Sequence, residues 1–327
     1  MITVYHADDG RIVRGGSEAL TGKALWVDLL DPTREEEQAV EDLLSIDVPT
    51  REEMQEIEVS SRLMRDGDTL IMTSPVLTNS SGFDPRNSAV TFILAGGRLV
   101  TVRYDTPQAV ATFAARLERN SAHPPMATGG QVLLGLLESV VDRMADVLER
   151  IGLELDGVSH RIFHQPAGGR GRRRSNSREL EVTLKSIGRN GDLSSKARDT
   201  ILGMRRVVGF LPSTDEALGV VDARSRLKTI GRDLQSLSEY ADFLNNKIGF
   251  LLDATLGMIN IQQNQIIKLF SVVAVLFLPP TLVASWYGMN FHDMPELGWR
   301  FGYPYALALA IFAAVVPYWI FKRKGWM

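Results

Sequence analysis

The chain has 327 residues, of which 45% are hydrophobic and 23% are charged, and its formal net charge is -3 at pH 7. This composition is typical of a folded protein, and its balance of charge gives no indication of a nucleic-acid partner. The chain contains no cysteine, which excludes disulfides, thiolate catalysis and cysteine-ligated zinc but leaves oxygen-ligated divalent cations open.

Residues 1–125 are predicted to form a mixed α/β domain, because short apolar runs alternate with acidic helix starts. The chain does not begin with a basic segment followed by an apolar core, so no secretory signal is expected and this domain is placed in the cytoplasm. Gly96-Gly97 is predicted to form a hairpin turn between the last two strands. Four strands are expected, at 24–30, 70–76, 89–94 and 99–103.

Three helix starts in this region carry capping signals. Thr33 with Glu36, and Thr50 with Glu53, fit the reciprocal arrangement in which a hydroxyl and a carboxylate each accept a backbone N–H bond. The dipeptide beginning at Thr106 is predicted to cap a further helix.

Residues 126–212 are predicted to form a helical hairpin. Apolar residues from Leu133 to Ile151 recur at helical spacing, which is typical of a helix that packs on a core. The segment 164–177 contains proline and several glycines, so it is predicted to be the hairpin tip. Its arginine-rich part, 170–174, either contacts phospholipid or phosphate or is a solvated basic loop, and the solvated loop is the simpler interpretation.

A long helix is predicted over 213–268, continuing into the first membrane span. Ser213 and Glu216 fit a capping box at its start, and no proline follows before Pro279. Apolar residues recur at heptad spacing from Leu227 onward, which is typical of a coiled-coil seam. With the span included, this helix would be about 100 Å long. We interpret it as a stalk that packs against copies of itself or against an adjacent hairpin.

Two segments near the C-terminus, 269–290 and 303–321, are predicted to span a bilayer. Neither contains a charged residue, and each provides the roughly 19 uncharged residues that the hydrocarbon core requires. The loop 291–302 joins them. Lys268 precedes the first span and the basic tail 322–327 follows the second, so the positive-inside rule places both termini in the cytoplasm.

One face of the first span carries mostly small and hydroxylic side chains. Such a face indicates either close packing between helices or a water-lined passage, and spacing alone favours packing. Pro279 and Pro280 remove two backbone donors, so carbonyls of the preceding turn require protein or water. At alternating steps of three and four residues, this polar stripe consists of Asn264, Ile267, Ser271, Ala274, Leu278, Thr281, Ser285 and Gly288.

The first span ends in the sequence Tyr-Gly-Met-Asn-Phe at 287–291, and the loop after it contains Met-Pro-Glu-Leu at 294–297. By themselves, Gly288 and Asn290 are most simply left-handed residues after a helix end. Together with the Lys-Arg-Lys tail, however, these motifs resemble the CorA family of divalent-cation transporters. The resemblance covers the whole chain in outline. It implies an α+β protein of a bacterial inner membrane, with an N-terminal α/β cytoplasmic domain, a long helical stalk and two C-terminal transmembrane helices.

The resemblance further implies a homopentamer in the lipid bilayer, with the first span lining a central pore for Mg²⁺. Gly288, Met289 and Asn290 would form the selectivity filter at the outer mouth, and Glu296 belongs to the outer-loop motif. Phe270 occupies the position of the hydrophobic gate, where an aliphatic residue is usual. The pore-lining positions are Asn264, Ile267, Phe270, Ser271, Ala274, Leu278, Thr281 and Ser285.

Asp253 is implied as the acidic site at which intracellular metal holds the closed state, with Asp84 as a candidate partner. From its place on a stalk helix alone, Asp253 is equally a solvated surface residue. Two alternatives stay open. One is a Zn²⁺, Co²⁺ or Ni²⁺ transporter of the same family, against which Met289 argues mildly. The other is a membrane-anchored coiled-coil scaffold or mechanosensor that conducts nothing. The sequence shows no phosphate-binding loop, nucleophile–base pair or histidine cluster, so an enzyme is not expected.

Overall fold

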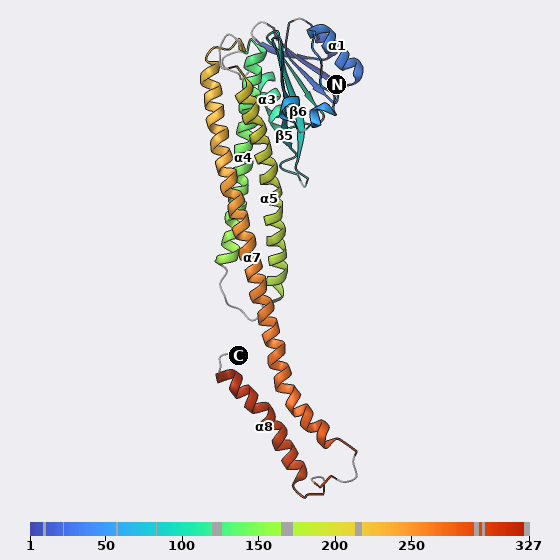
Figure 1. The fold of residues 1–327 in the computed structure, drawn as a ribbon, viewed down its shortest axis with the longest axis vertical. Helices are drawn as coiled ribbons and strands as arrows, with labels where there is room; N and C mark the ends of the chain where they lie inside the picture. The colour runs from blue at the N-terminus through green and yellow to red at the C-terminus, as the bar shows by residue number, and fades with distance from the viewer. Residues whose placement is uncertain are drawn as a thin grey trace. The chain divides into compact units, whose positions relative to one another are not determined.

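The structure is a computed structural model that divides into two compact units (Figure 1). The first unit contains Met1–Gly169 and Glu181–Leu252, and the second contains Arg170–Leu180 and Asp253–Met327. Helix α7, Ala223–Tyr287, contributes residues to both units. The structure describes residues 1–8, 11–21, 23–56, 58–82, 84–119, 126–164, 173–212, 218–290, 294–295 and 298–323.

Within the described residues, the first unit is built on a seven-stranded sheet with the strand order β2-β1-β3-β7-β6-β5-β4. Strands β3 and β7 pair in parallel, and the other neighbouring strands are antiparallel. The prediction of a mixed α/β domain is therefore confirmed. The strands are β1 Ile2–Asp8, β2 Arg11–Gly15, β3 Ala24–Leu30, β4 Leu63–Asp66, β5 Thr69–Thr78, β6 Arg86–Ala95 and β7 Arg98–Arg103.

The four predicted strands are confirmed as β3, β5, β6 and β7, and Gly96 and Gly97 form the turn between the last two. Both glycines have positive φ, +54° and +76°, a conformation in which a Cβ atom would be strained. Strands β1, β2 and β4 were not predicted. Strands β2 and β4 are the two edges of the sheet, and three of the four β4 side chains are exposed, so these edges lack an apolar signal.

The capping predictions have mixed outcomes. Thr33 and Glu36 form the predicted reciprocal bonds at the start of helix α1, Arg34–Leu44. Thr50 and Glu53 also bond reciprocally, but they support only the single 3-10 turn η2, Glu53–Gln55. The helix predicted after the dipeptide Thr106-Pro107 is confirmed as α3, with Pro107 at its N-cap. The Thr106 hydroxyl does not cap it and instead accepts a bond from Arg103.

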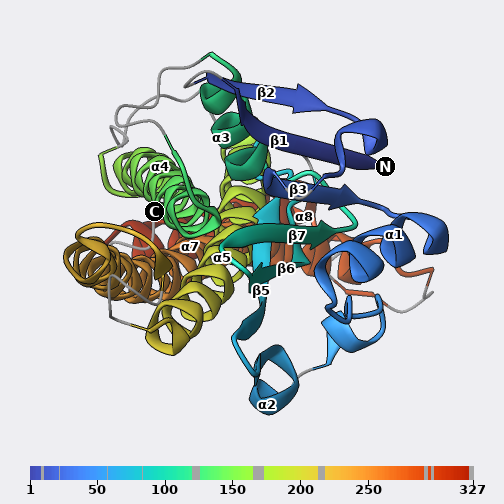
Figure 2. The ribbon, with the colours of Figure 1, turned by 90° about the horizontal axis from the view of Figure 1, so that it is seen from above.

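Helices cover both faces of the sheet, α1 on one side and α3 and α4 on the other (Figure 2). The apolar stripe predicted on the first hairpin helix is buried along α4 from Leu133 to Ile151, which confirms that prediction. Helix α5 begins at Arg173, inside the predicted hairpin tip 164–177, so the last part of that tip is helical and the predicted loop is too long. Residues 165–172 lie outside the described residues. The remaining elements are η1 Ser17–Ala19, α2 Val59–Arg62, α3 Gln108–Glu118, α4 Gly129–Phe163, α5 Arg173–Phe210 and α8 Gly302–Arg323.

Helix α7 begins at Ala223, so the prediction of an unbroken helix from residue 213 is wrong. Gly219 and Asp222 adopt left-handed backbone conformations, with φ of +60° and +61°, and these interrupt the helix. Ser213 and Glu216 lie outside the described residues. From Ala223 the helix continues through Pro279 to Tyr287 as one element of 65 residues.

The first part of α7 buries its heptad positions within the first unit. Most side chains at these positions, including Leu227, Leu234 and Leu251, are buried, and those of Leu237 and Ile248 are half-buried. Ion pairs join α7 to the neighbouring helices: Arg226 to Glu138 and Lys247 to Asp156 on α4, and Asp242 to Arg198 on α5. Of the two partners that the sequence left open for this seam, the adjacent hairpin of the same chain is therefore the one that covers it.

A buried ion pair joins the parallel strands at the centre of the sheet. Arg103 on β7 donates from Nη2 and Nε to the two carboxylate oxygens of Asp28 on β3, at 2.7 and 3.0 Å. Thr101 donates to the same carboxylate at 2.7 Å and accepts a bond from Trp26 Nε1 at 2.9 Å. Phe113 of α3 packs edge-on against the Trp26 ring. Because the Arg103 and Asp28 side chains are only 8% and 6% exposed, neither can be rehydrated when the other is removed.

We expect Asp28→Asn to lower the free energy of unfolding by about 3–5 kcal/mol, because it leaves the Arg103 guanidinium buried without a counter-charge. Glu118→Gln removes one partner of the exposed ion pair with Arg14 and is expected to cost no more than about 1 kcal/mol. Chemical unfolding of the full chain in detergent, followed by circular dichroism, measures both. Equal stability of the two variants would contradict the role given to the buried pair.

Candidate ion-conducting site

Two helices of the second unit are long and apolar enough to cross a membrane: the C-terminal part of α7, and α8. Their large apolar side chains are exposed in the single chain; Phe277, for example, is 68% exposed. A continuous apolar surface of this kind is unstable in water and requires lipid or other protein to cover it. The fold is therefore that of an α+β membrane protein, with two membrane-spanning helices at its C-terminal end.

One face of α7 is partly covered. Val272 is 8% exposed, and Leu276, Pro279, Val283 and Tyr287 are intermediate in exposure and follow it at helical spacing. We call these five residues the covered face. The sequence analysis did not single them out, because in an apolar span they look the same as residues that face lipid.

A matching face occurs on α8. Ala306, Ala310, Ala313 and Pro317 are intermediate in exposure and follow one line along that helix. Small side chains allow two helices in a membrane to approach closely. We interpret the covered face of α7 and this face of α8 as the contact between the two spans of one chain.

The polar stripe lies on the opposite side of α7. All eight of its positions, from Asn264 to Gly288, are exposed. At 3.6 residues per turn, the centre of the stripe is rotated by about half a turn from the covered face. Phe270, 69% exposed, borders the stripe. The predicted pore-lining residues therefore share one side of the helix, and the second span of the same chain leaves that side open.

The hydroxyl group of Thr281, on the polar stripe, forms a hydrogen bond within its own helix. Its Oγ1 donates to the carbonyl of Phe277 at 2.7 Å, so the hydroxyl proton is used within the helix and the oxygen remains an acceptor. Pro279 and Pro280 lie inside α7 without ending it, although their missing N–H groups leave the carbonyls four residues earlier without the usual helical donor.

The predicted filter residues follow directly after α7. The Gly288 N–H donates to the Ala284 carbonyl at 2.9 Å and the Met289 N–H to the Trp286 carbonyl at 3.4 Å, so the backbone tightens as the helix ends. Neither Gly288 nor Asn290 has a left-handed backbone, so the simple interpretation of them as left-handed residues after the helix is wrong. Gly288, Met289 and Asn290 are all exposed.

The remaining predicted site residues are either outside the described residues or exposed on the surface. Glu296 lies outside the described residues, as do residues 170–172 of the arginine-rich segment. Asp253 is exposed in the second unit, and Asp84 is exposed on the β5–β6 loop of the first. Among the residues that the structure describes, no group of three or more His, Cys, Asp or Glu side chains could hold a metal ion. The pairing of Asp253 with Asp84 stays a prediction.

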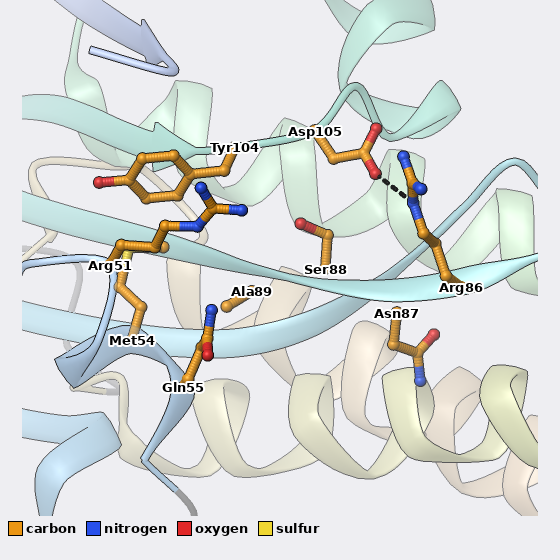
Figure 3. Close-up of a pocket in the computed structure, with 9 residues that line it drawn as sticks. All are labelled: Arg51, Met54, Gln55, Arg86, Asn87, Ser88, Ala89, Tyr104 and Asp105. Atoms are coloured by element: carbon orange, nitrogen blue, oxygen red, sulfur yellow. Dashed lines mark hydrogen bonds and ion pairs between the residues drawn. The ribbon is translucent and has the colours of Figure 1, made fainter. Parts of the chain in front are cut away.

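A pocket of about 390 Å³ in the first unit is not a suitable cation site (Figure 3). The Arg51 guanidinium lies over the Tyr104 ring, and Arg86 forms an ion pair with Asp105 at 2.8 Å. Among the described residues that line it, Asp105 is the one carboxylate. Burial raises the pKa of Asp105, but bonds from Arg86, the Thr106 N–H and Thr78 outweigh it and hold the pKa below its ordinary value. That carboxylate is already occupied by donors.

Comparisons with known proteins agree with this architecture. The family model described as CorA-like Mg²⁺ transporter protein matches residues 21–323. A magnesium transport protein CorA of Pasteurella multocida is 35% identical over 329 residues, covering 100% of both chains. The protein of the same name from Escherichia coli K12 is 35% identical over 332 residues, again covering 100% of both.

Solved structures show the same fold. The complete CorA magnesium transporter of Methanocaldococcus jannaschii superposes with a TM-score of 0.73 at 18% identity, covering 100% of this chain and 99% of that one. The full-length CmaX protein gives a TM-score of 0.68 at 18% identity, covering 99% of this chain and 97% of that one.

Single-cysteine variants test which side of α7 is wet, because the natural chain contains no cysteine. We expect Ser271→Cys and Ser285→Cys, on the polar stripe, to react with a charged, water-soluble thiol reagent in membranes. Leu276→Cys and Val283→Cys, on the covered face, should react at least about tenfold more slowly, because apolar surroundings disfavour the thiolate. Labelling rates on the full chain in vesicles measure this. Equal rates on both faces would contradict a water-filled stripe.

Proposed function

Because the chain belongs to the CorA-like Mg²⁺ transporter family, we propose that it carries Mg²⁺ across a bacterial inner membrane, with both termini in the cytoplasm. The relatives named as magnesium transport proteins match it over their full length. One structural observation carries the proposal furthest: the polar stripe of α7 is exposed along its whole length, opposite the face assigned to α8. Lys268 and Lys322 at the cytoplasmic ends of the spans support the orientation.

The passage requires several copies of the chain. A single polar stripe cannot enclose water, and α8 is assigned to the wrong side of α7 to complete the wall. A closed ring of copies places one stripe from each around an axis, with the α8 helices outside. The resemblance to the family suggests five copies, so we propose that the assembly is a homopentamer.

The outer mouth is suited to a hydrated ion. Mg²⁺ releases its water ligands slowly, so acceptors for the hydrogens of its hydration shell capture it more readily than carboxylates that bind the metal directly. A ring of Asn290 side-chain oxygens, together with Gly288 carbonyls, supplies such acceptors without net charge. Such a ring binds weakly enough to release the ion inward, where an inside-negative potential favours a divalent cation by about 4.6 kcal/mol per 100 mV.

Further along the stripe, polar and apolar positions alternate. The Thr281 hydroxyl donates its hydrogen bond to the Phe277 carbonyl, so its oxygen would face the passage as an acceptor for coordinated water. Leu278 and Phe270 would form apolar rings nearer the cytoplasm. Narrow apolar rings close a passage by expelling water from it, so these two residues are the proposed gate. Phenylalanine at 270 closes a larger cross-section than an aliphatic side chain.

Asp253 is the proposed sensor of cytoplasmic Mg²⁺, with Asp84 as its candidate partner. We place this site between neighbouring copies of the chain, where a bound ion would act on the closure of the ring. Metal bound between copies would hold the ring closed and give negative feedback. When cytoplasmic Mg²⁺ falls, the carboxylates would lose the cation between them, and their mutual repulsion would loosen the ring.

We expect Asn290→Ala to lower Mg²⁺ uptake into liposomes by at least about tenfold, because the ring of acceptors at the outer mouth is lost. Asn246→Ala, an exposed asparagine of α7 in the first unit, is the matched control and should leave uptake unchanged. Uptake is measured with a Mg²⁺-sensitive dye inside the liposomes. Unchanged uptake by Asn290→Ala would rule out the proposed filter.

The same liposomes separate the two alternative functions. Zn²⁺, Co²⁺ and Ni²⁺ are added in competition with Mg²⁺, and a transporter selective for one of them would carry it at concentrations where Mg²⁺ flux is not measurable. A scaffold or mechanosensor would give no selective flux of any of these ions. Mg²⁺ flux that the other ions reduce only at higher concentration supports the proposal.

We expect Asp253→Asn to weaken the feedback, so that higher internal Mg²⁺ is needed to stop uptake. The neutral amide keeps the size of the side chain and removes the charge that would bind metal. Asp233→Asn, another exposed carboxylate of the same helix, is the control. Uptake is compared in liposomes loaded with a series of Mg²⁺ concentrations. Identical inhibition curves for Asp253→Asn and the natural chain would remove Asp253 from the mechanism.

A further inference from the structure

Two arginines of α4 converge on the loop between β5 and β6. Arg143 donates from Nη2 to the hydroxyls of Ser80 and Ser81, at 2.6 and 3.1 Å. Arg150, two turns along the helix, donates from Nη1 to the Ser81 hydroxyl at 3.3 Å and from Nη2 to the Ser80 carbonyl at 2.6 Å. Both guanidinium groups therefore bond to one hydroxyl oxygen. We call Arg143 and Arg150 the arginine pair.

The arginine pair lacks a bonded counter-charge. Within the described residues, neither member forms a salt bridge, whereas three other basic side chains of the α4, α5 and α7 bundle each pair with a carboxylate. Burial and the neighbouring Arg150 lower the pKa of Arg143, and Asp146 opposes them only in part. The Nε atom of Arg143 is buried and has no hydrogen-bond partner. The two positive charges of the arginine pair and the unbonded Nε of Arg143 are thus held together at a cost in free energy of folding.

We propose that the arginine pair and the hydroxyls of Ser80 and Ser81 bind the phosphate group of a soluble compound. A phosphate dianion matches the two positive charges, and its oxygens accept bonds from several directions at once. The hydroxyls now accept bonds from the guanidinium groups, so their own protons are available to an anion. Ser81 is exposed, which gives the site access to solvent.

The bound phosphate would join α4 to the β5–β6 loop within the first unit. A third guanidinium, from Arg189 on α5, donates to the Gly82 carbonyl of the same loop at 3.3 Å. The loop also carries Asp84, the candidate partner of the proposed Mg²⁺ sensor. The anion site itself does not depend on that sensor, because all of its donors belong to one chain.

The test measures binding of radiolabelled orthophosphate, and separately of ATP without Mg²⁺, to the full chain in detergent by equilibrium dialysis. We expect saturable binding of at least one of the two. Arg150→Gln should weaken it about tenfold or more, since bonds to a charged group are lost. Arg65→Gln removes an exposed arginine whose Nε donates to the Gly67 carbonyl and should have no effect. Binding of orthophosphate identifies the free anion as the source, and binding of ATP alone identifies a phosphate ester.

Three results would overturn the proposal: no saturable binding of either probe, equal binding by Arg150→Gln and the natural chain, or displacement of phosphate by acetate at equal concentration. Gel filtration and circular dichroism establish that each variant is folded. If Arg150→Gln does not fold, Ser81→Ala serves instead, because it removes one donor from an exposed position and should also weaken binding.

Discussion

The two sides of α7 within the bilayer face different surroundings, and the rest of the proposed mechanism depends on this difference. Val272 and Leu276 belong to a partly covered face, whereas Ser271 and Ser285 lie on an exposed one. Hydroxyl groups turned towards lipid would be costly without partners. The chain therefore requires either water or further copies of itself on that side, and a ring of copies around water satisfies both requirements.

In the first unit, α7 packs against helices of its own chain. Its heptad side chains from Leu227 to Leu251 are buried or half-buried against the hairpin of the same chain, so they are not needed for contacts between copies. The sheet is held by the buried pair of Asp28 and Arg103, which fixes the register of the parallel strands. A buried ion pair is sensitive to substitution, because loss of either partner leaves the other charge buried and unpaired.

Charge is used differently in the two units. Along the stripe from Asn264 to Gly288, the proposed passage uses neutral oxygen acceptors, which suit a cation that keeps its water. In the first unit, Arg143 and Arg150 are gathered around serine hydroxyls without a bonded carboxylate, which suits an anion. The two proposals together assign to one chain a passage for Mg²⁺ and a separate site for phosphate compounds.

The sequence by itself determined the features that depend on local pattern. Uncharged length marked the spans, short apolar runs marked β3 and β6, and the reciprocal Thr33–Glu36 cap and the glycine turn at 96–97 followed from nearby residues alone. It could not locate the edge strands β2 and β4, the start of α7 or the covered face, because these depend on partners distant in the chain. Only the tertiary structure decided that the hairpin buries the heptad seam and that Arg143 and Arg150 meet at Ser81. Burial and charge balance are properties of neighbours in space, and adjacent letters of the sequence do not specify them.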